Sequence, residues 1–98
     1  MPAYLILFSF TPQGIHKIKE SPVRIEAARR TVEAMGGTTK AFYALLGSQY
    51  DTLFVIEARD DESLARMSLA IASGGNVRTE SHRLFTEAEY RKVVSSLS

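Results

Sequence analysis

Two stretches of this chain, Tyr4–Phe10 and Leu53–Ile56, carry aromatic or aliphatic side chains at nearly every position. Successive side chains of a strand alternate between the faces of a sheet, so both stretches are apolar on both faces. Strands of this kind are typical of a sheet whose two faces are both covered. The pattern therefore predicts central strands with helices over one face and a second apolar layer over the other.

Capping residues and glycine pairs mark where helices begin and end in the rest of the sequence. A hydroxyl or carboxylate side chain caps the first turn, and proline suits the position that follows it. Glycine ends a helix because it accepts the left-handed conformation. The start signals are Thr11-Pro12, Ser21-Pro22, Asp60 and Thr86, and the end signals are Gly36-Gly37 and Gly74-Gly75.

These signals predict four strands, over 3–10, 38–46, 50–58 and 76–85. A short helix over 12–19 and a long one follow the first strand, another follows Asp60, and a last one covers about 87–94. The order is that of the ferredoxin-like βαββαβ sandwich of the α+β class, with an extra short helix after the first strand and a C-terminal helix. We expect residues 1–98 to form a single domain.

The second face of such a sheet needs a cover that the chain itself does not provide. The two long helices lie over one face, and the C-terminal helix is too short to span four strands. A large exposed apolar face would be adhesive. We therefore expect a homodimer in which two sheets pack face to face and form a barrel-like core.

Composition excludes several classes of function. The net charge is +1, which gives no strong field for nucleic acid or a membrane surface. The absence of cysteine excludes disulfides, thiol catalysis and zinc–thiolate sites, and the two histidines lack metal-ligand spacing. The glycine pairs follow helices rather than precede them, so they are not phosphate loops. We expect no cofactor, no metal and, because no signal or membrane segment is apparent, a cytoplasmic location.

Arg78, Glu80 and His82 alternate along the fourth strand and therefore share one face. If that face lies toward a second subunit, it presents a cation, a carboxylate and an imidazole near the interface. A histidine beside a carboxylate can act as a general base or bind a ligand. The alternative interpretation is a solvated charge ladder in which Arg78 pairs with Glu80.

Four further residues are candidates for a ligand site. Tyr50 and Asp51 lie at the hairpin between the second and third strands, where they could orient a ligand, although an aspartate there also commonly binds backbone N–H groups. His16 lies near the end of the short helix, where a surface role stabilised by the helix dipole is the alternative. Tyr43 faces the same side as Thr39 in an unbroken strand and could point into a barrel.

Several segments together resemble the GYD domain proteins. The resemblance implies a ferredoxin-like fold of the dimeric α+β barrel type and supplies no catalytic residues. One departure is that two residues separate Gly47 from Tyr50-Asp51, where the family usually has one, which favours a longer turn or a bulge. The similar segments are Tyr4-Leu5-Ile6-Leu7-Phe8, Thr11-x-x-Gly14, Ser21-Pro22-x-Arg24, Gly47…Tyr50-Asp51, Gly75-Asn76-Val77-Arg78-Thr79-Glu80 and Phe85-Thr86-Glu87-Ala88-Glu89-Tyr90.

The sequence leaves three hypotheses for function. The first is a homo-oligomer that binds a small molecule in the barrel, with His82 or Arg78 on the pocket wall. The second is a cofactor-free enzyme of oxygenase or isomerase type in the same pocket, and it rests on analogy of fold. The third is a noncatalytic assembly module.

Overall fold

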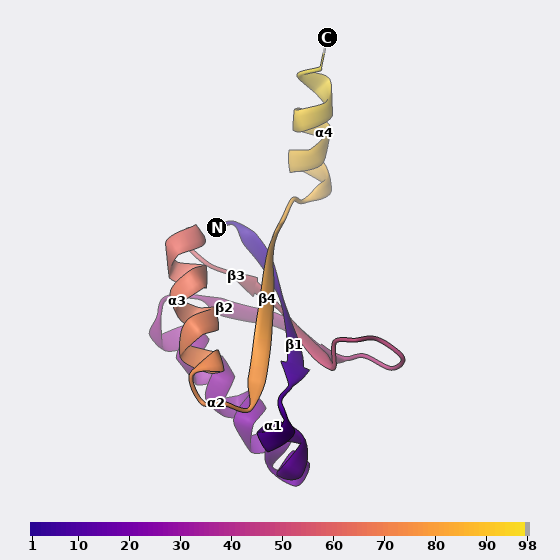
Figure 1. Cartoon of the computed structure of the whole chain (residues 1–98). Coiled ribbons are helices and arrows are strands. Elements are labelled where there is room, and N and C mark those ends of the chain that lie inside the picture. The colour runs from indigo at the N-terminus through magenta and orange to yellow at the C-terminus, as the bar shows by residue number, and fades with distance from the viewer. Residues whose placement is uncertain (98) are drawn as a thin grey trace.

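A four-stranded antiparallel sheet with strand order β2-β3-β1-β4 is the frame of the molecule (Figure 1). The computed structural model describes residues 1–97. The predicted ferredoxin-like βαββαβ order of the α+β class is confirmed. The strands are β1 (Ala3–Phe10), β2 (Thr38–Ala44), β3 (Thr52–Glu57) and β4 (Val77–Leu84); the helices are α1 (Pro12–His16), the 3-10 turn η1 (Ile18–Glu20), α2 (Ser21–Ala34), α3 (Asp61–Ala72) and α4 (Glu87–Ser95).

Helices α2 and α3 lie together over one face of the sheet and bury it (Figure 1). Phe54 lies at the centre of this core, with edge-to-face ring contacts to Phe8 at 5.3 Å and to Phe42 at 5.9 Å. Edge-to-face aromatic pairs stabilise a core beyond the burial of their area. The buried apolar side chains are Tyr4, Ile6, Phe8, Val32, Phe54, Ile56, Ala58, Leu64 and Met67.

A register shift in β2 changes the faces that the unbroken alternation predicts. Thr39 pairs with Ile56 and Ala41 with Val55, so Lys40 is the extra residue of a bulge. As a result Thr39 lies on the helix-covered face, whereas Ala41 and Tyr43 lie on the other. The expectation that Tyr43 and Thr39 share a face was therefore wrong, because a bulge reverses the alternation.

The first turn after β1 is packed tightly against the start of β4. Thr11 caps α1 by accepting the Gly14 N–H, and its own hydroxyl donates to the Gly75 carbonyl at 2.6 Å. A Cβ atom at Gly14 would lie 2.1 Å from the Asn76 carbonyl oxygen. Glycine is therefore required at this position by the close approach of two backbone segments.

Helix α4 stands clear of the rest of the structure, at the end of the molecule where β4 finishes (Figure 1). The radius of gyration is 14.7 Å, larger than the roughly 13 Å of a compact domain of this length. The predicted capping box of Thr86 and Glu89 is confirmed. Arg83 fixes the direction in which α4 leaves the end of β4. Its guanidinium lies 5.7 Å from the centre of the Tyr4 ring and 4.9 Å from that of the Phe85 ring, and it pairs with the Glu89 carboxylate at 3.2 Å.

The apolar stripe of α4 is uncovered. Tyr90, Val93 and Val94 follow helical spacing, so they lie on one side of the helix, and Leu97 comes two residues after the helix ends. Each is about half exposed or more. An isolated helix of this length is marginal in water, so a stripe of this kind is typical of a helix that packs against another surface. No helix within residues 1–97 is long and apolar enough to cross a membrane.

Candidate functional site

The face of the sheet opposite α2 and α3, here called the open face, is apolar at its centre and polar along β4. Strand register places Leu5 and Leu7 of β1 beside Val55 and Leu53 of β3, and all four are only half-buried. On the other side the same two leucines face His82 and Glu80 of β4. The open face consists of Ala3, Leu5, Leu7, Ser9, Ala41, Tyr43, Leu53, Val55, Glu57, Arg78, Glu80, His82 and Leu84.

Three of the predicted site residues meet on this face. The Tyr50 hydroxyl donates a hydrogen bond to Glu80 Oε1 at 2.5 Å, and His82 Nε2 lies 2.6 Å from Glu80 Oε2. Glu80 and His82 come from β4, whereas Tyr50 reaches them from the loop between β2 and β3. One carboxylate is thus held between a phenol and an imidazole, and we call Tyr50, Glu80 and His82 the carboxylate cluster.

The hydrogen bonds of the cluster shift two pKa values in opposite directions. The Tyr50 hydroxyl, and after it His82, lower the pKa of Glu80 because they stabilise the ionised carboxylate. The same bond to Glu80 raises the pKa of Tyr50, since the phenol proton is held by an anion. Glu80 therefore stays ionised and orients the His82 ring, an arrangement suited to a general base or to a hydrogen-bond donor for a ligand.

Solvent exposure limits what the cluster can do within one chain. The His82 and Glu80 side chains are 51% and 46% exposed. Charges so exposed interact weakly because water screens them. The interpretation of Arg78 and Glu80 as a paired ladder does not describe this arrangement, since Glu80 engages Tyr50 and His82 while Arg78 stands opposite Ser9.

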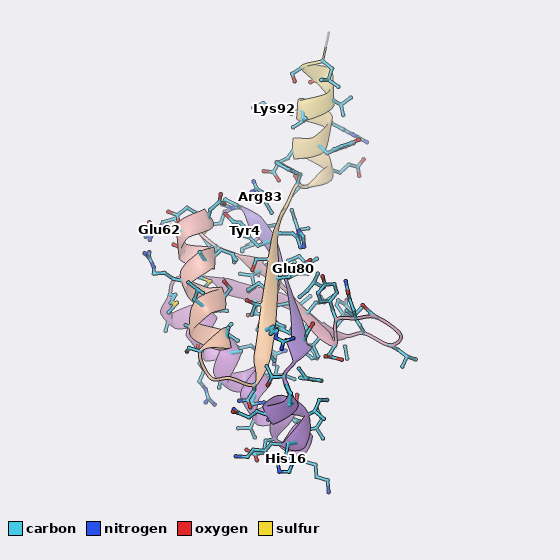
Figure 2. The ribbon with its side chains drawn as sticks, in the orientation of Figure 1. Tyr4, His16, Glu62, Glu80, Arg83 and Lys92 are labelled. Carbon is cyan, nitrogen blue, oxygen red and sulfur yellow. The ribbon has the colours of Figure 1, made fainter. Side chains whose placement is uncertain are left out.

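The remaining predicted residues lie apart from the cluster. His16 is exposed at the end of α1, at the opposite end of the molecule from α4 (Figure 2). Tyr43 is on the open face but 62% exposed. Within residues 1–97, no three His, Asp or Glu side chains gather closely enough to hold a metal ion.

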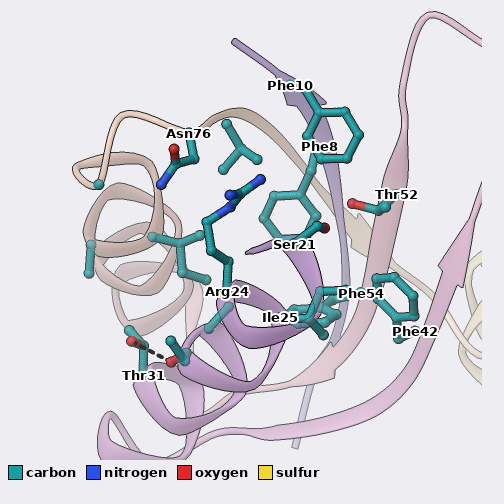
Figure 3. A pocket seen from close by; sticks show the side chains of 16 residues that line it. Phe8, Phe10, Ser21, Arg24, Ile25, Thr31, Phe42, Thr52, Phe54 and Asn76 are labelled. Atoms are coloured by element: carbon teal, nitrogen blue, oxygen red, sulfur yellow. Dashed lines mark hydrogen bonds between the residues drawn. The ribbon is translucent and has the colours of Figure 1, made fainter. Parts of the chain in front are cut away.

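A cleft of about 220 Å³ lies on the other face of the sheet, between the strands and helices α2 and α3 (Figure 3). Aromatic rings of the core form its wall, and the cavity reaches side chains of α2 from Ser21 to Thr31. Its described lining contains none of the predicted site residues. Sequence reasoning missed this cleft; the one available signal is the small pair Ala27-Ala28 at a point where α2 faces large aromatic residues.

The GYD domain family matches residues 4–94 of the chain, which is nearly its whole length. The chain belongs to the GYD domain family. It is also similar to the "Glutamine synthetase and cystathionine beta-lyase binding protein" of Thermus thermophilus, with 36% identity over 80 residues that cover 81% of this chain and 83% of the relative.

Solved structures share the fold of this GYD domain at low sequence identity. A protein from Thermus thermophilus superposes with a TM-score of 0.57 and 20% identity, over 88% of this chain and 95% of that one. The Leucine response regulatory protein LrpA of Mycobacterium tuberculosis superposes with a TM-score of 0.63 and 16% identity, over 87% of this chain and 51% of that one. This chain thus spans about half the length of the regulator.

The tyrosine and aspartate of the family motif have separate roles in this GYD domain. Tyr50 joins the carboxylate cluster. The Asp51 carboxylate accepts the Phe10 N–H at 2.8 Å, while the Asp51 N–H donates to the Phe8 carbonyl at 2.8 Å. Asp51 therefore fastens the hairpin to the end of β1, where a carboxylate satisfies a backbone donor that the ladder leaves open.

Proposed function

We propose that this GYD domain is a self-associating, noncatalytic binding module in which two copies pack their open faces together. The observation that carries the proposal is the half-buried apolar centre of the open face, formed by Leu5, Leu7, Leu53 and Val55. Monomeric proteins rarely leave contiguous apolar patches of this kind uncovered. A second copy offers a surface of the same shape and chemistry, and a two-fold pairing is self-complementary.

The proposed dimer also changes the environment of the carboxylate cluster. Glu80 and His82 lie beside Leu7 and Leu5, so packing of two open faces would enclose the cluster between the sheets. Removing water from a hydrogen-bonded charge strengthens its interactions. Glu80 and His82, which are exposed in a single chain, would then lie at the rim or in the interior of the dimer interface.

The test of self-association uses two leucines, one on the open face and one on the outer side of α3. Leu7→Glu introduces a charge at the centre of the open face, and Leu69→Glu introduces the same charge on α3, where Leu69 is 69% exposed. Light scattering coupled to size exclusion should give about twice the 10.9 kDa chain mass for wild type and for Leu69→Glu, and the single mass for Leu7→Glu. A wild-type mass of one chain at about 100 µM, where a dimer of micromolar dissociation constant is almost fully formed, would overturn the proposal.

We further propose that the assembled module binds other proteins through the apolar stripe of α4. Two observations support this: the stripe of Tyr90, Val93 and Val94 is exposed, and a 36% identical relative is named as a binding protein for two enzymes. Helices with one apolar face commonly dock in a groove of a partner. Arg83 and Glu89 hold the helix in a defined direction, which lowers the ordering cost of binding.

Binding should be measured with glutamine synthetase and cystathionine beta-lyase purified from the organism that encodes this chain. Immobilised wild type should retain one or both enzymes, and Val94→Glu on the stripe should weaken binding at least tenfold. Ala88→Glu adds the same single negative charge on the other side of the helix, where Ala88 is exposed, and should bind within about twofold of wild type. Equal binding by both variants would exclude the stripe as the contact.

A second candidate function is small-molecule binding at the carboxylate cluster, with or without cofactor-free chemistry. The observation that favours it is the hydrogen-bonded arrangement of Tyr50, Glu80 and His82 beside an apolar surface. A metabolite panel read by thermal shift tests it, because a ligand raises the melting temperature by mass action. The gain should disappear in His82→Ala and persist in His16→Ala; no gain with any metabolite would favour the assembly module alone.

A further inference from the structure

The cleft under α2 and α3 has the form of a small-molecule site and lies on the opposite face from the surfaces proposed for self-association. Its wall is formed by Phe8, Phe42 and Phe54, whose rings also pack on one another. Ile25 and Ile71 line it from the two helices (Figure 3). The lining is therefore mainly apolar, as is typical of pockets for small ligands.

The size of the cleft limits the ligand. Its volume is about 220 Å³, and an apolar cavity of roughly 150 Å³ accepts benzene. A single ring with a short chain, or a branched aliphatic chain of similar size, would fill the space. Larger ligands would require α2 and α3 to move apart.

One cation stands in this apolar setting without an anion. Arg24 is the single charged residue in the described lining of the cleft, and its guanidinium extends into the cavity beside Asn76 (Figure 3). Two of its N–H groups donate to main-chain carbonyls, to that of Lys17 at 2.8 Å and to that of Gly14 at 3.1 Å. These acceptors are neutral, so they fix the guanidinium in place but do not balance its charge.

The N–H groups of Arg24 that the two carbonyls do not use are available to a ligand. A guanidinium has five N–H donors, and two are used by the carbonyls. A carboxylate accepts from a guanidinium with strong charge-assisted hydrogen bonds. Ser21, at the start of α2, adds a hydroxyl to the same region of the lining.

We infer that the cleft binds a small monocarboxylate whose apolar part is one aromatic ring or a branched aliphatic chain. The apolar part lies against Phe8, Phe42 and Phe54, and the carboxylate lies against Arg24. This site shares no residues with the proposed dimer interface or with α4. The cleft can therefore bind a ligand even if the proposals of self-association and of partner binding fail, and the reverse also holds.

The test compares an acid with its neutral analogue. Full-length ¹⁵N-labelled protein is titrated with 3-phenylpropionate and with 3-phenylpropionamide, which have the same ring and chain. The acid should produce saturable shifts at the amides of residues that line the cleft, Ala28 and Ile71 among them. The amide should bind at least tenfold more weakly because it carries no charge for Arg24.

Two pairs of variants locate the site. Ala28→Leu fills the cleft and should abolish binding, whereas Ala65→Leu adds the same volume on an exposed side of α3 and should bind like wild type. Ala70→Val, a smaller filling change in the same lining, should weaken binding at least threefold if Ala28→Leu does not fold. Arg24→Gln should remove the preference for the acid, and Arg24→Lys should keep it.

Three outcomes would overturn the inference. The first is equal affinity for acid and amide, which removes the role of the cation. The second is wild-type affinity in a folded cleft-filling variant, which moves the site elsewhere. The third is the absence of saturable shifts with 3-phenylpropionate and with the branched acid 4-methylpentanoate.

Discussion

The two faces of the sheet are built from the same strands but differ in what covers them. On the helix-covered face, Phe54 and Ile56 of β3 are 1% and 0% exposed. On the open face, their neighbours Leu53 and Val55 are only half-buried. Both faces are apolar along β1 and β3, yet within residues 1–97 only one of them is covered by helices. Burial is therefore set by the helices, and the half-buried leucines and valine of the open face are what supports the proposed pairing with a second copy.

The largest expected difference between the two faces is in the loss of stability caused by substituting neighbouring residues of β3. Phe54→Ala should lower the free energy of unfolding by about 3–5 kcal/mol, since it removes the centre of the core and leaves a cavity. Leu53→Ala should cost roughly 1 kcal/mol in dilute protein, because its side chain is already half in water. Urea titrations of both variants measure the difference.

The same pair sharpens the proposal for the open face. The cost of Leu53→Ala should increase with protein concentration if a second copy covers that residue, whereas the cost of Phe54→Ala should not. Equal costs for the two variants in dilute protein would contradict the comparison itself.

Concentration should affect stability through the open face alone. The melting temperature of wild type should rise by several degrees between roughly 1 and 100 µM, because association stabilises the folded state by mass action. Leu7→Glu should abolish this dependence and Leu69→Glu should keep it. Calorimetry at several concentrations makes the measurement, and a flat wild-type curve would show that the open face is uncovered in solution.

One tyrosine on each face allows the pH dependence of stability to be compared between the faces. Tyr4, on the helix-covered face, donates to Asp61 at 2.5 Å; burial, and after it this bond, raise the pKa of Tyr4 from 10.0 to about 12. Below pH 10 the phenol keeps its proton in both folded and unfolded chains, so its contribution is fully present. Between pH 10 and 12 the unfolded chain loses the proton first, so the free energy of unfolding falls as pH rises.

Tyr4→Phe should remove that part of the alkaline destabilisation. Tyr43→Phe removes the same hydroxyl on the open face, where Tyr43 is 62% exposed, and serves as the matched control. Urea titrations from pH 9 to 12, within the roughly two-unit window set by these pKa values, make the measurement. Parallel curves for wild type and Tyr4→Phe would refute the role of Tyr4.

The smallest effect concerns the carboxylate cluster. The pKa of Glu80 should lie below 4.5, the ordinary value, and Tyr50→Phe should raise it because the variant removes the strongest hydrogen bond to the carboxylate. The stability contributed by Glu80 is present above pH 4.5 and is lost as pH falls through the lowered pKa. A ¹³C titration of the Glu80 side-chain carboxyl carbon in wild type and in Tyr50→Phe gives both values.

The sequence predicted some parts of the site better than others. Arg78, Glu80 and His82 share a face because alternation along an unbroken strand is a local property. The meeting of Tyr50 with Glu80 could not be predicted, since it depends on the path of the loop between β2 and β3. The prediction that Thr39 and Tyr43 share a face was wrong because the bulge at Lys40 arises from the pairing of β2 with β3, which the sequence of β2 alone does not reveal.

Local chemistry determined the elements of this GYD domain: the strands, the capping of α1 and α4 and the two-sided apolar character of β1 and β3 follow from side chains a few residues apart. Tertiary structure decided the rest. The direction of α4 depends on the Arg83 guanidinium lying over the rings of Tyr4 and Phe85. The cleft depends on how α2 and α3 lie over the sheet. These features join residues distant in the chain, and the space between packed elements is set by their mutual positions rather than by any one segment.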